Sequence, residues 1–538
     1  MARSENTEYD FVIVGAGSAG CVLAARLTED RTTRVLLLEA GVGKEPLAAR
    51  IPAAFSKLFK TRHDWAYQSE PEPALLGRRL YIPRGKLLGG SSAMNAMIYI
   101  RGNPLDYDRW AAAGADGWSY ADVLPFFERS EDQGRGALPG HGVGGPMRVE
   151  DGRYRNPLSA AFVEACGQVG IPYNEDFNSG RQDGAGYYQV TQKAGRRWSA
   201  ANAYLFPAIG RPNLTVVRGA HVTRIVFDQQ KAIGVEYLKD NRRLLARARR
   251  ESILAAGAIG SPQLLLLSGV GPADALSSFG IRAVVELDGV GKNLQDHPAI
   301  GIALECTKPI SLRIAEAPMA YLEYAARRTG PLCSNIAEAG AFVRSYSTAE
   351  APDIQFHFAP AYYVDHGFVR PPGHGFTIGP TLVAPSSRGR LTLRSAQPFA
   401  PPLICGNHLS EARDMKALLA GIKLAREIAA AAAFGPYRGA EYLPGASAKS
   451  DQDLENHIRS MVELLYHPCG TCKMGKDDEA VVDPELRVRG VSGLRVADAS
   501  VMPTITRGNT NAPTIMIAER LAAWLRDERG ARSVRAAS

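Results

Sequence analysis

Three glycines and one glutamate near the N-terminus have the spacing of a nucleotide-binding turn. Gly15, Gly17 and Gly20 follow a short apolar run, and Glu39 ends the next one. Glycines at this spacing let the backbone turn tightly, approach a pyrophosphate and begin a helix whose N-terminus faces phosphate oxygens. The glutamate can accept hydrogen bonds from ribose hydroxyls and would repel a 2′-phosphate. The pattern therefore predicts a site for FAD or NAD.

Two strands and a helix must hold these residues in place. Residues 11–14 are a continuous β-branched and aromatic run, residues 21–27 are apolar with helical character, and residues 35–38 form a second buried strand. A glycine-rich loop alone could be an ordinary turn. Because strand, glycines, helix, strand and acid follow in order, the pattern indicates a βαβ dinucleotide fold.

Two other groups of residues could do chemistry. Cys469 and Cys472, with Gly470 and Thr471 between them, could indicate thiol redox chemistry or half of a zinc site. No second cysteine pair follows, so we expect no metal and interpret them as small side chains packed near a ligand. A glycine and serine turn opens residues 85–102, where free N–H groups could approach a phosphate or a flat ligand, although an ordinary turn would look the same.

The whole chain limits the remaining possibilities. It has 538 residues, which predicts roughly two to four domains, or one large domain with a second built from insertions. Seven irregularly spaced cysteines indicate reduced thiols. The formal charge of +8 is dispersed, so we expect no nucleic-acid partner and leave open a weak attraction to anionic membrane surfaces. Without an apolar run of about 20 residues or a signal peptide, we expect a cytoplasmic protein that could associate with the inner face of the membrane.

Five separated motifs together resemble the glucose-methanol-choline (GMC) family of FAD-dependent alcohol oxidoreductases. They are residues 85–108, 257–271, 290–297, 467–475 and 508–514. Within the family, residues 182–193 and 509–517 are similar to bacterial choline dehydrogenase-like proteins, in particular FAD-linked dehydrogenases of aliphatic alcohols and polyethylene glycol.

The resemblance implies a fold of two domains. The first is an α/β Rossmann-type FAD-binding domain, discontinuous over residues 1–155, 200–307 and 465–538. The second is an α+β substrate-binding domain with an antiparallel sheet, over residues 156–199 and 308–464. The sequence pattern agrees with the second domain. Apolar and polar residues alternate over residues 354–358 as in an antiparallel strand, and apolar residues recur at helical spacing over residues 415–428.

The resemblance also implies FAD rather than NAD and assigns its contacts. Gly15, Gly17 and Glu39 would hold the ADP part, Val222 the adenine, and Asp498 and Ala499 the ribityl chain and pyrophosphate. The full set of expected FAD contacts is Gly15, Gly17, Ser18, Ala19, Gly20, Glu39, Ala40, Leu88, Gly89, Gly90, Ser91, Met94, Asn95, Ala96, Met97, Val222, Ala256, Asp498, Ala499, Asn511 and Pro513. Some members attach FAD through a histidine where this chain has Met94. Since a thioether cannot form that link, we expect FAD to be bound non-covalently.

Alcohol oxidation needs a base for the hydroxyl proton and an acceptor for the hydride. Histidine, with a pKa near 6.5, suits the base at neutral pH. His467 matches the family's catalytic base and Asn511 its second polar position, where an amide would orient the alcohol oxygen. Pro513 would place the N-terminal end of a helix near the flavin. We expect His297 to be structural and His357 and Phe356 to line the substrate pocket.

These expectations define a reaction and its rivals. The reaction would convert a primary alcohol (aliphatic, polyether or aryl) to an aldehyde, with electrons passed to a quinone or another acceptor. The alternatives are an oxidase that uses oxygen, a choline dehydrogenase and, from another class, a FAD-containing hydroxynitrile lyase. A flavin-binding protein without catalysis is disfavoured because both expected catalytic residues are present.

Overall fold

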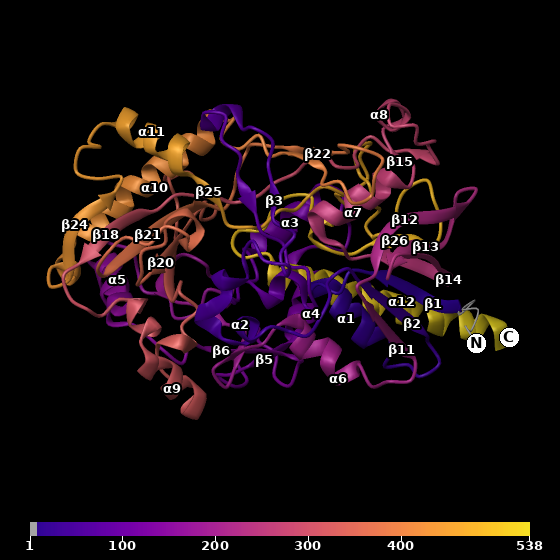
Figure 1. Ribbon diagram of the computed structural model, residues 1–538, viewed down its shortest axis with the longest axis horizontal. Coiled ribbons are helices and arrows are strands. Elements are labelled where there is room, and N and C mark those ends of the chain that lie inside the picture. Colours follow the sequence, from indigo (N-terminus) through magenta and orange to yellow (C-terminus); the bar gives the residue numbers. More distant parts are fainter. Residues whose placement is uncertain (1–7, 538) are drawn as a thin grey trace.

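Two β-sheets, one from each expected domain, form the framework of the protein (Figure 1). The computed structural model describes residues 8–537, with side chains up to residue 528. The first sheet combines N-terminal and C-terminal elements, and the second comes mostly from the middle of the chain. The expected combination of a Rossmann-type domain and an antiparallel substrate domain is confirmed.

The first sheet has a parallel centre with an antiparallel extension. Its hydrogen-bonded order is β11 (Leu214–Arg218), β2 (Val35–Glu39), β1 (Glu8–Val14), β14 (Arg242–Leu254), β13 (Lys231–Lys239) and β12 (His221–Asp228), and β26 (Leu494–Val496) also pairs with β14. In β1, Val12 lies between Leu36 of β2 and Ser252 of β14. Residues 11–14 and all of β2 are buried, as expected for strands covered on both faces.

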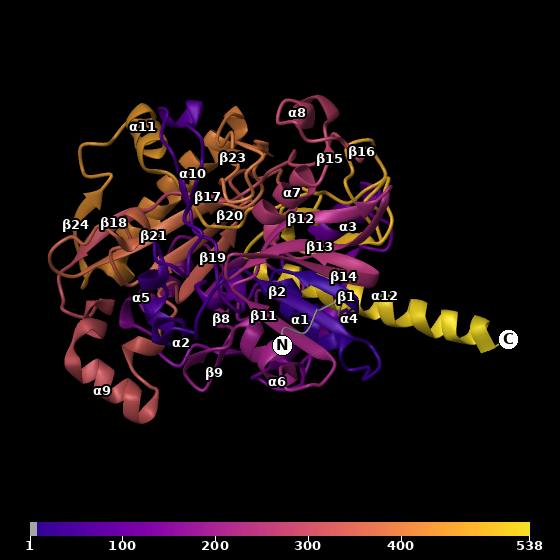
Figure 2. The ribbon, with the colours of Figure 1, turned by 45° about the vertical axis from the view of Figure 1, so that its right-hand side comes forward.

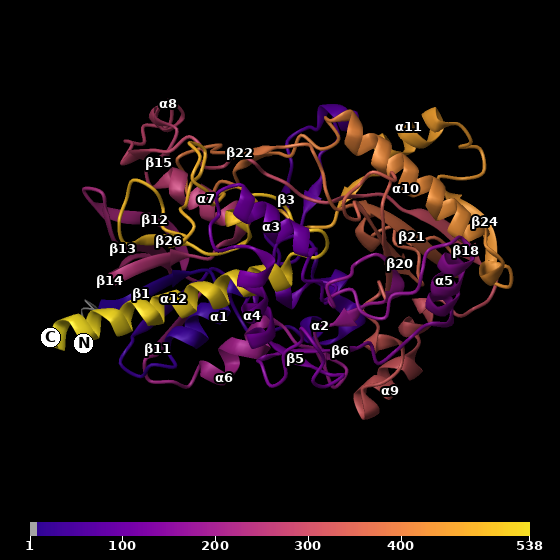
Figure 3. The same ribbon diagram turned by 180° about the vertical axis from the view of Figure 1, so that it is seen from behind.

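Three helices bring the ends of this sheet's strands to one region. α1 (Ser18–Leu27) crosses from β1 to β2, α7 (Gly257–Leu267) follows β14, and α12 (Asn511–Ala537) runs beside α1 in all three views (Figures 1–3). Arg26 of α1 and Glu519 of α12 form an ion pair of 2.8 Å. α12 begins two residues before Pro513, where the sequence analysis placed the N-terminal end of a helix.

The second sheet is antiparallel and has helices on one face. Its strands are β24 (Arg438–Leu443), β18 (Ile302–Cys306), β21 (Gly375–Leu382), β20 (Ile354–Ala359), β19 (Ala339–Val343) and β7 (Gly184–Tyr187), joined by β17 (Pro298–Ala299) and β25 (Glu463–Leu464). The helices α5 (Pro157–Gln168) and α10 (Ala412–Ala430) pack on it (Figure 3). Phe162 stacks on Phe358 at 4.8 Å between α5 and β20. The opposite face of the sheet borders the candidate functional site.

One predicted domain boundary needs correction. The expected FAD-binding segment extended to residue 307, but β17 and β18 pair with β21 inside the second sheet. The chain thus enters the substrate sheet directly after residue 297, because Pro298 and Ala299 already pair with β25. The other proposed boundaries stay as predictions.

Shorter elements surround the two sheets. The remaining α-helices are α2 (Leu47–Arg50), α3 (Pro104–Ala112), α4 (Tyr120–Ser130), α6 (Phe206–Ala208), α8 (Ala273–Ser277), α9 (Pro318–Arg327) and α11 (Asp451–Met461). The remaining strands form small ladders: β3 (Tyr67–Gln68) with β4 (Tyr81–Ile82), β9 (Gln192–Lys193) with β10 (Arg196–Arg197), β15 (Val270–Gly271) with β16 (Val285–Glu286), β22 (Arg390–Thr392) with β23 (Leu403–Cys405), and β5 (Glu131–Gln133) with β6 (Met147–Asp151) and β8 (Gln189–Val190). Within residues 8–537, no helix combines the length and apolar character that spanning a membrane requires.

Candidate active site

A cavity of about 940 Å³ receives residues from both sheets. The glycine turn after β1 and the end of β2 line one part of it, and His357 of β20 and Thr381 of β21 line another. This volume is near the upper end of about 300–1,000 Å³ that is common for ligand pockets. The cavity therefore has room for a long cofactor and a small substrate together.

Two glycine turns meet at the nucleotide end of the cavity. A Cβ atom on Gly90 would lie 2.7 Å from Cα of Gly17, and the N–H of Gly89 donates to the carbonyl of Ala16 at 2.8 Å. A Cβ on Gly20 would lie 1.9 Å from the carbonyl oxygen of Gly15, so α1 can begin this close to the turn only with glycine. At Gly17 itself, the nearest protein atom to a Cβ position is 3.9 Å away, which leaves backbone open to a ligand.

Two buried carboxylates have fixed positions near these turns. Glu39 accepts N–H bonds from Ala16 at 2.9 Å and from Gly41 at 2.8 Å, and burial raises its pKa to about 7. Asp498 accepts a hydrogen bond from the hydroxyl of Ser261 at 2.6 Å and from the N–H of Gly257 at 2.9 Å, and burial also raises its pKa. Both side chains are held by hydrogen bonds before any ligand binds.

Most residues expected to contact FAD line this cavity. They are Gly15, Gly17, Ser18, Ala19, Glu39, Ala40, Gly90, Ser91, Met94, Asn95, Ala96, Met97, Val222, Ala256, Asp498, Ala499 and Asn511. The cavity wall does not include Gly20, Leu88, Gly89 or Pro513. Gly20 and Gly89 act in the packing of the two turns, and Pro513 lies inside the first turn of α12.

His467 lines the cavity beside a second histidine. Its Nδ1 lies 3.0 Å from Nδ1 of His297, with the two rings nearly perpendicular. The backbone N–H groups of both residues donate to the same oxygen of Asp296, at 2.8 and 2.7 Å. Asp296 thus holds the two histidines together. His297, expected to be structural, is a direct neighbour of the candidate base.

The asparagine beside His467 is not the one predicted. Nδ2 of Asn509 lies 3.3 Å from Nε2 of His467, whereas Oδ1 of Asn511 accepts a hydrogen bond from the hydroxyl of Ser18 at 2.7 Å. Asn511 is the first residue of α12 and is turned toward the start of α1, while Asn509 lies in the preceding loop. The predicted pairing of His467 with Asn511 is therefore corrected to His467 with Asn509. The sequence contained this alternative, because the two asparagines are two residues apart.

Burial controls the protonation of the side chains around His467. The pKa of His467 is held well below its usual value, first by desolvation and then by the charges of His297, His357 and Arg84. Desolvation lowers the pKa of His297 to about 3 and raises that of Asp296 to about 7. Four buried polar atoms here have no hydrogen-bond partner among the described residues: Oδ2 of Asp296, Nε2 of His297, Nε2 of His357 and Oδ1 of Asn509. Such atoms mark a place where a polar ligand or water completes the structure.

The two residues expected to line the substrate pocket lie on opposite faces of β20. His357 lines the cavity, bonds Thr381 through Nδ1 at 3.2 Å, and has a pKa lowered by burial to about 4. Phe356 is fully buried and does not line the cavity. Because side chains alternate along a strand, only one of these neighbours can face the site, so the prediction for Phe356 is wrong.

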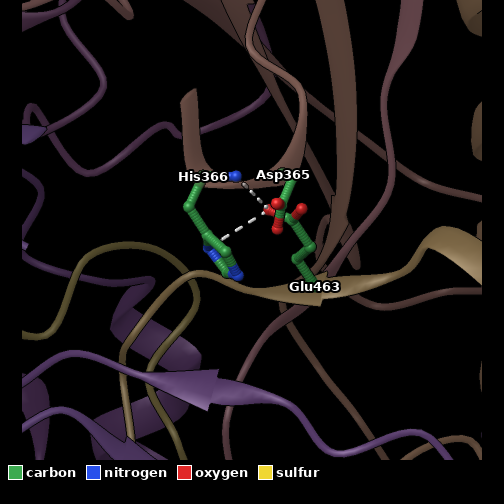
Figure 4. Close-up of side chains that lie close together, drawn as sticks. All are labelled: Asp365, His366 and Glu463. Carbon is green, nitrogen blue, oxygen red and sulfur yellow. Dashed lines mark hydrogen bonds and ion pairs between the residues drawn. The ribbon is translucent and has the colours of Figure 1, made fainter. Parts of the chain in front are cut away.

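A second group of ionisable residues lies at the substrate part of the cavity, where Asp365 and Glu463 line the wall. Asp365, His366 and Glu463 could offer ligand atoms within 4.8 Å of one another (Figure 4). His366 already bonds Glu463 through its backbone N–H, at 3.3 Å, and Tyr466 through Nδ1, at 2.5 Å. Burial lowers the pKa of His366 to about 4 and raises that of Glu463 to about 7. This network fixes Tyr466, the residue before His467.

The cysteine pair forms no disulfide, and neither thiol belongs to a group of three close metal-ligand side chains among the described residues. Cys469 and Cys472 are free and fully buried. Desolvation raises the pKa of both thiols, which keeps them protonated and unreactive.

Comparison with known proteins agrees with this geometry. The sequence matches the two GMC oxidoreductase domains, the N-terminal one over residues 9–299 and the C-terminal one over residues 385–518. The chain belongs to the GMC oxidoreductase family. This GMC oxidoreductase is 46% identical to the mitochondrial choline dehydrogenase of Homo sapiens, over 96% of this chain and 89% of the relative. It is 47% identical to the oxygen-dependent choline dehydrogenase of Brucella melitensis, over 95% and 94% of the two chains.

Solved structures show the same fold. Pyridoxine 4-oxidase from Mesorbium loti superposes with a TM-score of 0.89 at 33% identity, over 97% of this chain and 99% of that one. Formate oxidase from Aspergillus oryzae gives a TM-score of 0.92 at 28% identity, over 98% and 99%. The expected family and cofactor are thereby confirmed: this GMC oxidoreductase is a FAD-dependent enzyme that acts on an alcohol.

Proposed function

We propose that this enzyme oxidises a primary alcohol to the aldehyde, with His467 as the base. The observation that carries the proposal is the position of His467 on the cavity wall, between a histidine that contacts Nδ1 and an asparagine that contacts Nε2. Its lowered pKa keeps the imidazole neutral at pH 7, which is the form that can accept a proton.

The partner histidine determines which nitrogen of His467 is available. Only one proton can lie between the two Nδ1 atoms, so one ring donates and the other accepts. The side-chain nitrogen of Asn509 can only donate, so Nε2 of His467, 3.3 Å away, is the acceptor and the proton of the neutral His467 ring lies on Nδ1. We infer that Nδ1 of His297 accepts from Nδ1–H of His467. Nε2 of His467 then carries the lone pair that removes the hydroxyl proton.

Asn509 completes the site for the alcohol oxygen. Its amide lies beside Nε2 of His467, and its Oδ1 has no partner among the described residues. An alcohol placed between them would donate its proton to His467 while the amide N–H stabilises the negative charge that develops on oxygen. We assign to Asn509 the role that the sequence had given to Asn511.

FAD bound in the cavity would supply the acceptor for the hydride that leaves the same carbon. Glu39 and the turn at Gly17 would hold its ADP part, and Asp498 would hold its central part. Asn511 and the N-terminus of α12 would lie near the ring system. Met94 lies on the cavity wall and lacks the ring nitrogen through which a histidine would attach FAD, so we propose dissociable FAD.

The substrate is proposed to be an aliphatic, polyether or aryl alcohol, with choline as a second candidate. Phe55, Phe59 and Tyr363 line the cavity with apolar surface, which suits an uncharged alcohol. Choline is favoured by the choline dehydrogenases named above and by Glu463 and Tyr466 on the wall, since a carboxylate and an aromatic face attract a quaternary ammonium group. The electron acceptor is proposed to be a quinone.

An anaerobic titration of the FAD-loaded protein tests these proposals together. Alcohols from each class, choline included, are added while the flavin absorbance is followed, and air is then admitted. We expect bleaching by a primary alcohol and slow recovery in air. Rapid recovery with peroxide would identify an oxidase. The absence of bleaching by every alcohol would contradict alcohol oxidation and favour the lyase.

A further inference from the structure

One short helix exposes an apolar face to solvent. α9 protrudes from the body in the three views, and its side chains Met319, Leu322 and Tyr321 are 71%, 63% and 41% exposed (Figures 1–3). Ala325 and Ala326, one turn further on, are also exposed, and Ala320 is the buried member of the helix. Large apolar side chains grouped in this way usually mark an interaction site.

Basic side chains flank this face. Lys57 donates to the hydroxyl of Tyr321 at 3.3 Å, Arg313 lies five residues before α9, and Arg327 is its last residue. All three are exposed, and among the described residues none of them forms an ion pair. Of the nearby acids, Glu316 is paired with Arg370 at 2.9 Å, and Glu323 of α9 accepts a hydrogen bond from the hydroxyl of Thr329 at 2.9 Å. We define the docking face as Met319, Tyr321, Leu322, Lys57, Arg313 and Arg327.

The docking face is adjacent to the active-site cavity. Lys57 belongs to the 3₁₀ turn Pro52–Leu58, from which Phe55 lines the cavity, and Phe59 follows on the same wall. The opposite side of this turn packs with Ala315 and Ala320 beneath α9. A surface bound at α9 would thus lie against the same turn that forms the cavity wall.

We propose that the docking face binds the surface of an anionic lipid bilayer. Exposed apolar side chains, with three cations beside them that form no ion pair among the described residues, match the interface of a membrane, where the apolar groups enter the acyl boundary and the cations contact acidic headgroups. A second copy of the chain fits less well. A two-fold contact would bring like charges together, and one helix of ten residues provides little of the roughly 800 Å² per partner that a stable dimer buries.

Docking at a membrane rests on the proposed function and extends it, because it brings the enzyme to a quinone that can accept the electrons from the reduced cofactor. If the alcohol is oxidised as proposed, a membrane quinone takes two electrons and two protons and becomes a quinol. Docking through α9 would hold the enzyme at the membrane that contains this acceptor. Binding to lipid can be measured without any turnover, so the two proposals fail separately.

Co-sedimentation of the FAD-loaded enzyme with vesicles tests the docking face. Phosphatidylcholine vesicles with and without phosphatidylglycerol are compared at low and high salt. We expect binding to the anionic vesicles that weakens with salt, roughly tenfold weaker binding for Met319→Gln with Leu322→Gln, and about fivefold weaker binding for each of Arg313→Gln and Arg327→Gln. Ile209→Gln with Leu245→Gln, at exposed apolar sites of the other domain, is the matched control and should bind normally.

Reduction of a water-soluble dye by the alcohol should be equal in all these variants, which shows that the active site is intact. The proposal is overturned if the wild-type enzyme does not bind anionic vesicles, or if the Met319 and Leu322 variant binds as well as the control. It is also overturned if size-exclusion chromatography shows a dimer that this variant converts to a monomer, because a second copy would then cover the face.

Discussion

The two ends of the active-site cavity differ in how far the protein satisfies its own polar groups. At the nucleotide end, Glu39 and Asp498 each accept at least two hydrogen bonds from the protein. At the His467 end, four buried polar atoms have no partner among the described residues. The first arrangement is a rigid support that is in place before the cofactor binds. The second is incomplete until a substrate supplies the missing contacts.

Substitution of the base should have the largest effect. His467→Ala removes the proton acceptor but none of the residues expected to hold the ADP part of FAD. We expect flavin reduction by alcohol to slow by about 10²–10⁴-fold with FAD still bound. Anaerobic stopped-flow absorbance measures this rate, and the flavin spectrum of the purified variant is the control. An unchanged rate of reduction would show that His467 is not the base.

Substitution of Asn509 should have the next largest effect on flavin reduction, and substitution of Asn511 a smaller one. Asn509→Ala removes the amide beside Nε2 of His467 and should slow flavin reduction by about 10²–10³-fold. Asn511→Ala is the matched control, because it removes the same amide from the nucleotide side, where it bonds Ser18. We expect it to change the rate less than Asn509→Ala and to affect mainly FAD binding. A larger rate effect for Asn511→Ala would restore the pairing predicted from the family resemblance.

The same contrast explains what the sequence could predict. Residues 11–39 contain the whole βαβ pattern within one continuous segment, so spacing alone predicted the nucleotide end. The His467 corner is assembled from residues 296–297, 467 and 509, and no local periodicity brings these together. Resemblance identified His467, but the choice between two asparagines two residues apart depended on where α12 begins. His357 and Phe356 were both expected to line the pocket, although neighbours on a strand point to opposite faces, and the packing of α5 and α10 shows which face is the site.

His297 should control the base through its tautomer. In His297→Ala, Nδ1 of His467 loses its acceptor, so the lone pair is no longer confined to Nε2 and flavin reduction should slow by about 10- to 100-fold. The variant also removes a charge interaction that lowers the pKa of His467. The pKa of His467 should therefore rise in this variant. As the pH is lowered, its rate should begin to fall at a higher pH than the rate of the wild type, because a base is protonated below its pKa.

His297→Asn is the conservative variant for this test. Its amide oxygen can accept from Nδ1–H of His467 and should recover most of the rate. If His297→Ala and His297→Asn lose equal activity and both keep the wild-type pH profile, His297 only supports packing.

The smallest expected effect is on the pH dependence of FAD affinity, and it should depend on Glu39 at the nucleotide end of the cavity and not on Glu463 at the substrate end. Its pKa of about 7 in the cofactor-free protein means that the carboxylate, the better acceptor for ribose hydroxyls, forms as pH rises through 7. FAD affinity should thus increase across this range, and Glu39→Gln should abolish the increase and weaken binding by about tenfold at pH 8. Fluorescence titration of the apoprotein with FAD measures both. Glu463→Gln is the matched control, since that carboxyl group has a similarly raised pKa but lies at the substrate end of the cavity. An equal loss of pH dependence in both variants would mean that FAD binding senses the charge of the whole cavity rather than one ribose contact.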